Sequence, residues 1–216
     1  MKRGLFIVFE GGEGAGKSTQ TELLVRQLRA TDHQVVVTRE PGGTRIGEQI
    51  RAITHDPENV DLDAVTEAYL MAASRAQHVR ETIAPALHEG NIVVCDRYVD
   101  SSIAYQGYGR ALGEAVIADL NVLAVDDAQP DMVLLLNLPT EVGHERVEKE
   151  GKRKDRLDLQ EKDFYERVNN GYLTLAKTNP NRYVVVDATK SIEEVASVIW
   201  KTVEDALARR DEKKST

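Results

Sequence analysis

The sequence predicts an α/β protein built on a doubly wound, five-stranded parallel sheet flanked by helices. Two observations support this fold class. Five short apolar runs recur along the chain, and runs that are apolar on both faces are typical of central strands in a sheet covered on both sides. Helical patterns separate these runs, and strict alternation of strand and helix favours a parallel sheet with right-handed crossovers. The 216 residues suit one domain, spanning 1–216.

The predicted strands coincide with the apolar runs. In chain order they are Leu5–Phe9, Val35–Val37, Ile92–Cys95, Met132–Leu136 and Tyr183–Val186. The predicted helices follow apolar residues at three- and four-residue spacing. These residues are Leu24, Val25 and Leu28; Leu62, Val65, Tyr69 and Ala72 or Ala73; Val116, Leu120 and Leu123; Phe164, Val168, Tyr172 and Leu175; and Ile192, Val195, Ile199 and Val203. Gly90 stands where the helix before the third strand is expected to end.

Charge and composition exclude several classes of protein. The chain carries 28 Lys and Arg against 36 Asp and Glu, a formal charge of −8, which argues against a general nucleic-acid or anionic-membrane surface. The longest apolar run, Ala68–Ala73, is far shorter than the ~20 residues of a membrane span. Cys95 is the one cysteine, so no intrachain disulfide can form. We therefore expect a cytoplasmic protein with no nucleic-acid or membrane partner.

A glycine-rich segment follows the first predicted strand directly. Residues 11–18 read GGEGAGKS, which matches G-x-x-x-x-G-K-[ST] between a strand and a helix. The glycines let backbone N–H groups turn toward phosphate oxygens, where a Cβ would intrude. Lys17 can reach the β- and γ-phosphates, and the Ser18 hydroxyl can ligate Mg²⁺. The predicted ATP site comprises Gly11, Gly12, Glu13, Gly14, Ala15, Gly16, Lys17, Ser18 and Thr19.

Further polar segments follow the second and third predicted strands. They read TREPGGT (38–44) and CDRYVDSSIAYQGYGR (95–110), and a helix carries SRAQH (74–78). Because strand ends meet at the carboxyl edge of a parallel sheet, the arginines in the segments that follow the strands are expected near the phosphates. The segment EKEGKRKDRLD (148–158) is dense in charge, and we interpret it as a short mobile lid.

Together, FEGGEGAGKS (9–18), TREPGGT, CDRYVDSSIAYQGYGR and the arginine-bearing lid resemble the bacterial thymidylate kinase family. The resemblance runs over nearly the whole chain. It implies a P-loop kinase core that transfers the γ-phosphoryl group of ATP to dTMP, giving dTDP and ADP for dTTP biosynthesis. It also implies Mg²⁺ as cofactor and a homodimer formed through helices.

The resemblance implies roles for residues at the phosphates. The catalytic positions are held here by Lys17, Arg97, Arg153 and Arg156. Arg97 is placed to bridge donor and acceptor, and Asp96 assists the Mg²⁺ that Ser18 ligates. Family members with Gly after the acidic residue of the loop, as Gly14 is here, take a catalytic cation from the lid. Both lid arginines remain candidates for that cation.

The resemblance also assigns an acceptor pocket. Its positions are Glu13, Arg39, Glu40, Pro41, Arg51, Met71, Arg75, Arg97, Ser102, Tyr105 and Gln106. Arg39 and Arg97 address the acceptor phosphate, and Tyr105 crowds the sugar C2′ and so disfavours ribose. Arg75, Ser102 and Gln106 contact the thymine edge. Met71 departs from the family, which usually has a Phe that stacks on thymine, although a thioether can still pack on a ring.

Other interpretations remain open from the sequence. The chain could phosphorylate a different nucleotide, or a nucleoside, although arginines for an acceptor phosphate argue against the nucleoside. It could instead be a nucleotide-dependent switch that signals to a partner protein. Among single residues, Arg75 could be a solvated surface arginine, and His78 and Cys95 are expected to be packing residues rather than catalysts.

Overall fold

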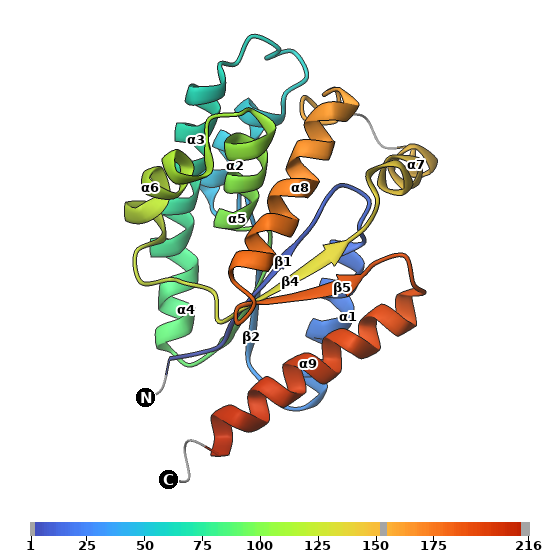
Figure 1. The fold of residues 1–216 in the computed structure, drawn as a ribbon. Coiled ribbons are helices and arrows are strands. Elements are labelled where there is room, and N and C mark those ends of the chain that lie inside the picture. The colour runs from blue at the N-terminus through green and yellow to red at the C-terminus, as the bar shows by residue number, and fades with distance from the viewer. Residues whose placement is uncertain (1–2, 152–154, 213–216) are drawn as a thin grey trace.

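Five parallel strands form one sheet through the middle of the molecule (Figure 1). The computed structural model describes residues 3–151 and 155–212. The strands are β1 (Phe6–Glu10), β2 (Val35–Arg39), β3 (Ile92–Asp96), β4 (Met132–Asn137) and β5 (Tyr183–Asp187). Their spatial order is β2-β3-β1-β4-β5, and every neighbouring pair is parallel. This confirms the predicted fold class.

Every strand runs one or two residues beyond its predicted apolar run and ends on a polar residue. The five end residues are Glu10, Arg39, Asp96, Asn137 and Asp187. The register places Phe9 beside Asp96 and Arg39 beside Asp96. The polar ends of β1, β2 and β3 are therefore neighbours at one edge of the sheet, as expected for a parallel sheet.

Helices cover both faces of the sheet. They are α1 (Lys17–Ala30), α2 (Arg45–His55), α3 (Ala64–His78), α4 (Ala84–His88), α5 (Val99–Ser102), α6 (Glu114–Val125), α7 (Thr140–Glu150), α8 (Lys162–Thr178) and α9 (Ile192–Glu212), with π-helical segments η1 (Val79–Ile83) and η2 (Ile103–Gly109). The predicted helices correspond to α1, the α3–η1–α4 run, α6, α8 and α9. Gly90, with φ 86°, follows the end of α4 as expected.

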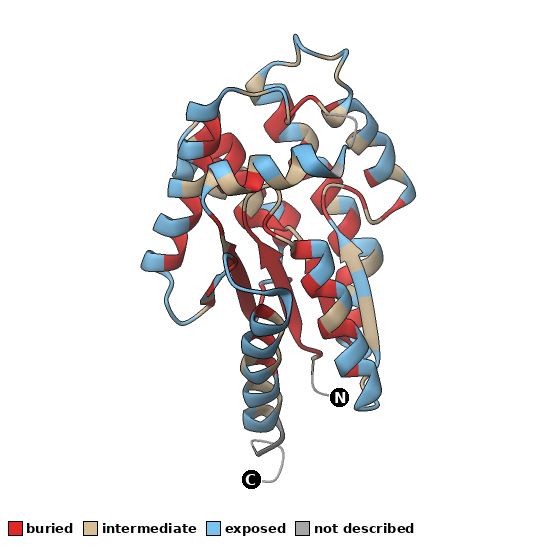
Figure 2. Cartoon of the chain, turned by 90° about the vertical axis from the view of Figure 1, so that its right-hand side faces the viewer, coloured by how far each residue is buried: buried red, intermediate tan, exposed pale blue. Residues whose placement is uncertain are grey.

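Two hydrophobic clusters sandwich the sheet, and alternate residues of β1 supply them. Phe6 and Val8 join one cluster with residues of α3, η2 and α8. Ile7 and Phe9 join the other with residues of α1 and α9. Figure 2 shows the buried strands between exposed helix faces. The sheet is thus fixed from both sides, and its carboxyl edge is a rigid base for loops.

Some of the apolar residues from which the helices were predicted do not face this core. Val65 and Tyr69 of α3 are 49% and 61% exposed, and Val116 and Leu123 of α6 are 60% and 78% exposed. On α3 the core contact comes instead from small residues such as Ala68. Within residues 3–151 and 155–212, no helix has the length and apolar character needed to cross a membrane.

A close contact between η2 and α8 fixes the segment that carries Tyr105 and Gln106. A Cβ built on Gly109 would lie 2.6 Å from Cε2 of Phe164 and 2.9 Å from Cγ2 of Val168. Both of those side chains are buried. Only glycine therefore allows η2 to approach α8 this closely.

We expect Gly109→Ala to lower the free energy of unfolding by about 1–3 kcal/mol, because the added methyl group overpacks the buried contact with α8. Gly107→Ala is the matched control in the same segment, since the nearest atom to its Cβ is 3.4 Å away. The control should stay within about 0.5 kcal/mol of the parent chain. Urea unfolding measures both, and equal losses would contradict the packing argument.

Candidate functional site

The loop Gly11–Ser18 joins β1 to α1 in a shape that glycine makes possible. Gly11, Gly14 and Gly16 have φ values of 138°, 67° and 86°. A Cβ on Gly11 would lie 2.5 Å from the carbonyl oxygen of Leu136, and one on Gly14 would meet the backbone of Gly143. Gly16 caps α1 without a side chain. The first N–H groups of α1 are thereby left free for a bound anion.

The ammonium group of Lys17 lies over this loop. Its Nζ donates to the carbonyl oxygens of Gly12 and Gly11, at 2.8 and 3.1 Å. Burial lowers the pKa of Lys17, and the nearby positive charge of Arg97 lowers it further. A phosphate bound in the loop would offset both effects, because it supplies negative charge where two cations meet.

Ser18 and Asp96 form a pair of oxygen ligands suited to Mg²⁺. The Ser18 hydroxyl donates to Oδ2 of Asp96 at 3.2 Å, and Oδ1 of Asp96 is buried with no hydrogen-bond partner in the described structure. An orphaned carboxylate oxygen beside a hydroxyl fits a hard cation. No group of three or more His, Cys, Asp or Glu that could hold a metal occurs among the described residues. A cation here would therefore take its remaining ligands from phosphate and water.

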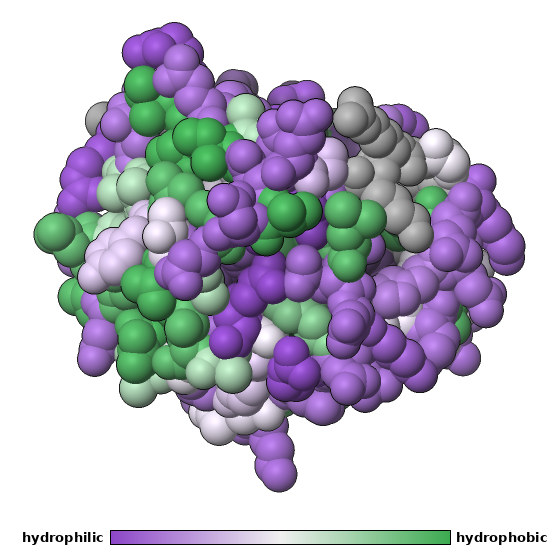
Figure 3. Space-filling model, turned by 90° about the horizontal axis from the view of Figure 1, so that it is seen from above, coloured by the Kyte–Doolittle hydropathy of each residue, from purple (hydrophilic) through white to green (hydrophobic). Residues whose placement is uncertain are grey.

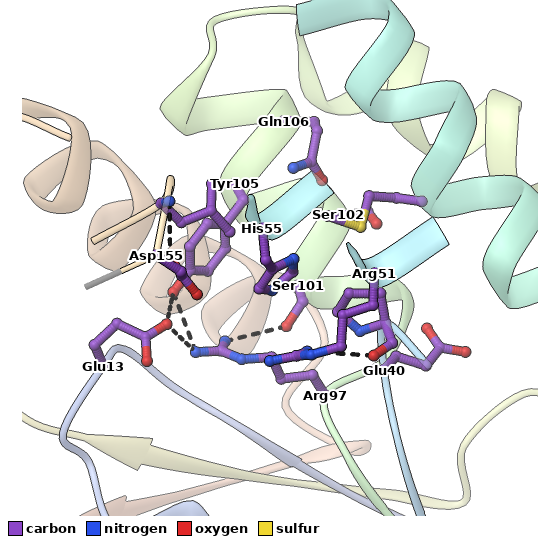
Figure 4. A pocket seen from close by; sticks show the side chains of 13 residues that line it. Glu13, Glu40, Arg51, His55, Arg97, Ser101, Ser102, Tyr105, Gln106 and Asp155 are labelled. Carbon is purple, nitrogen blue, oxygen red and sulfur yellow. Dashed lines mark hydrogen bonds and ion pairs between the residues drawn. The ribbon is translucent and has the colours of Figure 1, made fainter. Parts of the chain in front are cut away.

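Arg97 follows β3 and connects the elements of the site (Figure 4). Its backbone is left-handed, with φ 68°, and its N–H donates to Phe9 of β1 at 2.9 Å. Nη1 of Arg97 donates to the carbonyl oxygen of Gly11 at 3.0 Å and to Tyr172 at 3.1 Å. Nη2 donates to Glu13 at 2.6 Å. The guanidinium thus binds the glycine-rich loop, although 86 residues separate Arg97 from Gly11.

Glu13 neutralises Arg97 in this structure. Burial opposes ionisation of the Glu13 carboxyl, but the charges of Arg97 and Lys17 prevail and lower its pKa to about 2. The Tyr105 hydroxyl also donates to Glu13, at 2.9 Å. Glu13 is therefore ionised at neutral pH, and a phosphate that binds Arg97 must compete with it.

Two pockets meet at Arg97. The acceptor pocket is bounded by Pro41, His55, Met71, Ser101, Ser102, Tyr105, Gln106 and Leu157. The loop pocket is bounded by Gly14, Ala15, Gly16, Lys17, Ser18, Thr19, Arg39 and Asp96. The residues common to both are Glu13, Glu40, Arg51, Arg97 and Asp155. A group bound in each pocket would meet across this shared wall.

The structure brings most of the predicted acceptor residues to the acceptor pocket, but Arg39 and Arg75 differ. Arg39 lines the loop pocket, and its Nη2 pairs with both carboxylate oxygens of Glu48 at 2.9 Å. Gln106 lines the acceptor pocket, and its side chain donates to the buried Glu67 at 2.6 Å. The acceptor role of these residues stays a prediction.

Arg75 is buried, so it is not a solvated surface arginine. Its Nε and Nη2 bond Glu40 at 2.8 and 2.7 Å. Its remaining donors bond Ser102, Asn121 and the carbonyl oxygen of Tyr98. Arg75 therefore lies behind Ser102 with all its donors engaged by protein. Its predicted contact with the base is not seen among these bonds and stays a prediction.

His78 and Cys95 are buried as expected. The His78 ring lies between Glu40, at 2.9 Å, and Thr38, at 2.6 Å. Burial raises the pKa of the Cys95 thiol well above its usual range. Neither residue lines the acceptor or the loop pocket. Both are therefore packing residues.

Part of the predicted lid packs down on the pocket. Arg153 lies outside the described residues. Arg156 is buried, donates to the carbonyl oxygen of Thr54 at 2.9 Å and pairs with Glu67. Leu157 lines the acceptor pocket. The end of the lid is thus tied to α2 and α3, while the catalytic role of either lid arginine stays a prediction.

Several site residues were not singled out from the sequence. His55, at the end of α2, faces the acceptor pocket (Figure 4). Burial and the charge of Arg51 lower the pKa of His55 to about 3, so the ring is neutral. Glu10 and Glu67 are fully buried. A charge that interrupts apolar residues, as both glutamates do, was the signal available for them.

Comparison with known proteins gives a consistent result. A family model described as thymidylate kinase matches residues 9–199. A thymidylate kinase of Geotalea uraniireducens is 45% identical over 95% of this chain and 99% of the relative. One of Pelotomaculum thermopropionicum is 46% identical over 95% of each chain. The crystal structure of thymidylate kinase from Ehrlichia chaffeensis superposes with a TM-score of 0.76 at 33% identity, covering 94% of this chain and 99% of that one. The chain therefore belongs to the thymidylate kinase family.

Proposed function

We propose that Arg97 and Lys17 supply the positive charge with which this thymidylate kinase transfers the γ-phosphoryl group of ATP to dTMP, giving dTDP and ADP. The observation that carries the proposal is that Arg97 borders both the loop pocket and the acceptor pocket. ATP phosphates would lie in the loop pocket beside Lys17, and the dTMP phosphate in the acceptor pocket. The guanidinium of Arg97 would then contact both.

The chemistry requires charge neutralisation more than proton transfer. A phosphate monoester has a second pKa near 6, so the dTMP phosphate is mostly a dianion at pH 7 and needs no general base. The barrier lies in bringing two anionic groups together in line. Arg97 can bond two phosphoryl oxygens at once, which a lysine cannot. In exchanging Glu13 for phosphate, Arg97 would give up one anion for another.

In this proposal Ser18 and Asp96 hold Mg²⁺ beside the loop. Mg²⁺ held by these two residues would supply positive charge beside the phosphates of ATP. Lid arginines Arg153 and Arg156 remain candidates for the further catalytic cation. The same proposal places the reaction in the cytoplasm, where a free thiol such as Cys95 persists.

The acceptor pocket suits a deoxypyrimidine nucleotide. Met71 is buried on one wall and can pack against a base, while Ser102 and Gln106 offer polar groups to its edge. The ring of Tyr105 is fixed by the bond from its hydroxyl to Glu13 and by Arg97, whose guanidinium lies 5.1 Å from the ring centre. A fixed ring is a steric barrier to an additional hydroxyl on the sugar.

We expect dTMP to be the best acceptor in an ADP-release assay with thymidine, dTMP, dUMP, CMP and GMP. The value of kcat/KM for dUMP should be lower by about tenfold or more, because dUMP lacks one methyl group that the pocket can contact. Each acceptor is tested with and without Mg²⁺, and we expect transfer to require Mg²⁺. Reactions without acceptor measure ATP hydrolysis. A higher kcat/KM for another acceptor, or ATP hydrolysis unaffected by dTMP, would refute the assignment.

We expect Arg97→Lys to lower kcat by at least about tenfold and to change KM for ATP by less than about threefold, because lysine keeps the charge but loses the forked contact. Arg167→Lys is the matched control, since its guanidinium bonds the carbonyl oxygen of Gly109 and lines neither pocket. Steady-state kinetics measure both variants. Turnover of Arg97→Lys near that of the parent would refute the bridging role.

The apolar face of α3 and α6 suits a second copy of the chain. These helices pack side by side, and their exposed apolar residues are Val65, Tyr69, Val116, Val122 and Leu123. Figure 3 shows apolar side chains gathered on the side of the molecule where α3 and α6 lie. A contiguous apolar patch is typical of a protein interface. We infer that a homodimer covers this face, as the family resemblance also implies.

We expect Leu123→Glu to convert the dimer into a monomer, because a carboxylate would be buried without a partner at the interface. Val198→Glu on α9 is the matched control, since Val198 is 50% exposed but lies outside the patch. Light scattering after size-exclusion chromatography measures the mass of each variant. A monomeric parent chain, or a dimeric Leu123→Glu variant, would argue against this face.

A further inference from the structure

Glu10 is a fully buried carboxylate behind Arg97 that the proposed transfer does not use. It ends β1, and its Oε1 accepts the backbone N–H groups of Tyr98 and Ser101 at 2.9 and 3.1 Å. Those N–H groups lie at the start of α5, where the cap residue Tyr98 makes no side-chain cap. Glu10, at the end of β1, therefore caps the start of α5 and fixes the turn that follows Arg97.

The other oxygen of Glu10 sets the direction of two hydroxyl groups. Oε2 accepts from Ser101 at 2.6 Å and from Tyr172 at 2.9 Å. Nη1 of Arg97 donates to the same two hydroxyl oxygens, at 3.4 and 3.1 Å. An ionised carboxylate is an acceptor only, so both hydroxyl hydrogens can turn toward Glu10. Their lone pairs are then available to the guanidinium.

We propose that Glu10 is a positioning residue that orients Arg97 for phosphoryl transfer through the hydroxyl groups of Ser101 and Tyr172. This inference rests on the proposed function, because it assumes that Arg97 contacts the phosphates. The carboxylate acts at a distance, since the hydroxyl groups lie between it and the guanidinium. This arrangement leaves Nη2 of Arg97 available to bind phosphate in place of Glu13.

The fold holds Glu10 in a buried place, where water cannot solvate its charged form. Burial and the negative charge of Asp100 raise the pKa of the Glu10 carboxyl, Arg97 opposes the rise, and the resulting pKa is about 7. The charged or titratable groups that interact with it are Asp100, Arg97, Lys17, Cys95, Tyr172 and Tyr183. A raised folded-state pKa means that the stability Glu10 contributes is present below its unfolded pKa and is lost as pH rises toward 7. Ionised Glu10 therefore does not stabilise the fold.

The substitution Glu10→Gln tests the inference. A glutamine oxygen can still cap α5, but its NH₂ group donates where the carboxylate accepts. One hydroxyl group can then donate to the other, 2.8 Å away, but the second hydroxyl hydrogen must turn toward Arg97, which also donates. At about pH 8, where Glu10 is ionised, we expect kcat to fall by about 10- to 100-fold through misplacement of Arg97, with KM for ATP changed by less than about threefold. A kcat within about twofold of the parent would overturn the inference.

Thermal unfolding separates positioning from a structural role. At about pH 8, above the folded-state pKa, Glu10→Gln should leave Tm unchanged or higher, because it removes a buried charge. Asp131→Asn is the matched control: Asp131 is a carboxylate at the other end of β1 that accepts the backbone N–H of Phe6 at 2.8 Å, pairs with Arg3 at 3.0 Å and lines neither pocket. Asp131→Asn should change Tm but keep kcat within about twofold. A lower Tm for Glu10→Gln with unchanged kcat would assign Glu10 a structural role only.

A double-mutant cycle with Arg97→Lys distinguishes this inference from the proposed function. If Glu10 acts through Arg97, Glu10→Gln should slow Arg97→Lys by less than about threefold. If the losses in kcat caused by the two substitutions multiply in the double variant, the inference is overturned and the role of Arg97 stays intact. An Arg97→Lys variant with parental kcat would overturn the proposed role of Arg97 and this inference with it. If Glu10→Gln does not fold, Tyr172→Phe replaces it in the cycle. We expect Tyr172→Phe to lower kcat by a smaller factor in the parent chain and to lower it no further in the Arg97→Lys variant.

Discussion

The site depends on holding one guanidinium group between two carboxylates. The chain has a formal charge of −8, yet phosphoryl transfer needs concentrated positive charge at one edge of the sheet. Parallel pairing of β1 with β3 brings Arg97 to the glycine-rich loop. Glu13 pairs with it on the side of the pockets, and Glu10 lies behind it through two hydroxyl groups. The position of the charge is therefore determined by the sheet register, and its orientation by the carboxylates.

The sheet was predictable because its strands are continuous apolar runs, but their ends were not. Each strand extends onto a polar residue such as Glu10 or Asp96, because pairing with its neighbour continues past the last apolar side chain. The helix α2 carries Ile46, Ile50 and Ile53 at helical spacing, yet only Gly47 and Thr54 in it are fully buried. Tyr69 likewise follows a helical period and yet is exposed. Periodicity indicates a helix but does not show which partner covers its apolar face.

The loop of the site was predictable from the motif that contains Lys17 and Ser18, since the spacing itself requires a phosphate-binding shape. The partners of Arg75 were not predictable. They come from the loop after β2, from the cap residue and the end of α5, and from α6, as far as 46 residues away, and no local pattern encodes such contacts. The same holds for Arg156, which could be read only as a lid arginine until its buried pair with Glu67 was seen. Long-range ion pairs are a property of the folded chain.

Two buried glutamates and one partly exposed glutamate divide the site into a fixed part and an exchangeable part. Glu40 bonds Arg75 and Glu67 bonds Gln106, and both carboxylates are at most 4% exposed. The counterion of Glu40 is Arg75, and those of Glu67 are Arg110 and Arg156. Breaking such an ion pair leaves an uncompensated buried charge, so this wall of the acceptor pocket is preformed. The pair of Arg97 and Glu13 is different, because Glu13 is 31% exposed and borders both pockets. Replacing Glu13 by phosphate keeps Arg97 paired throughout. In the proposed function, base selection therefore rests on bonds that stay closed, and phosphoryl transfer rests on the pair of Arg97 and Glu13, which can open without leaving Arg97 unpaired.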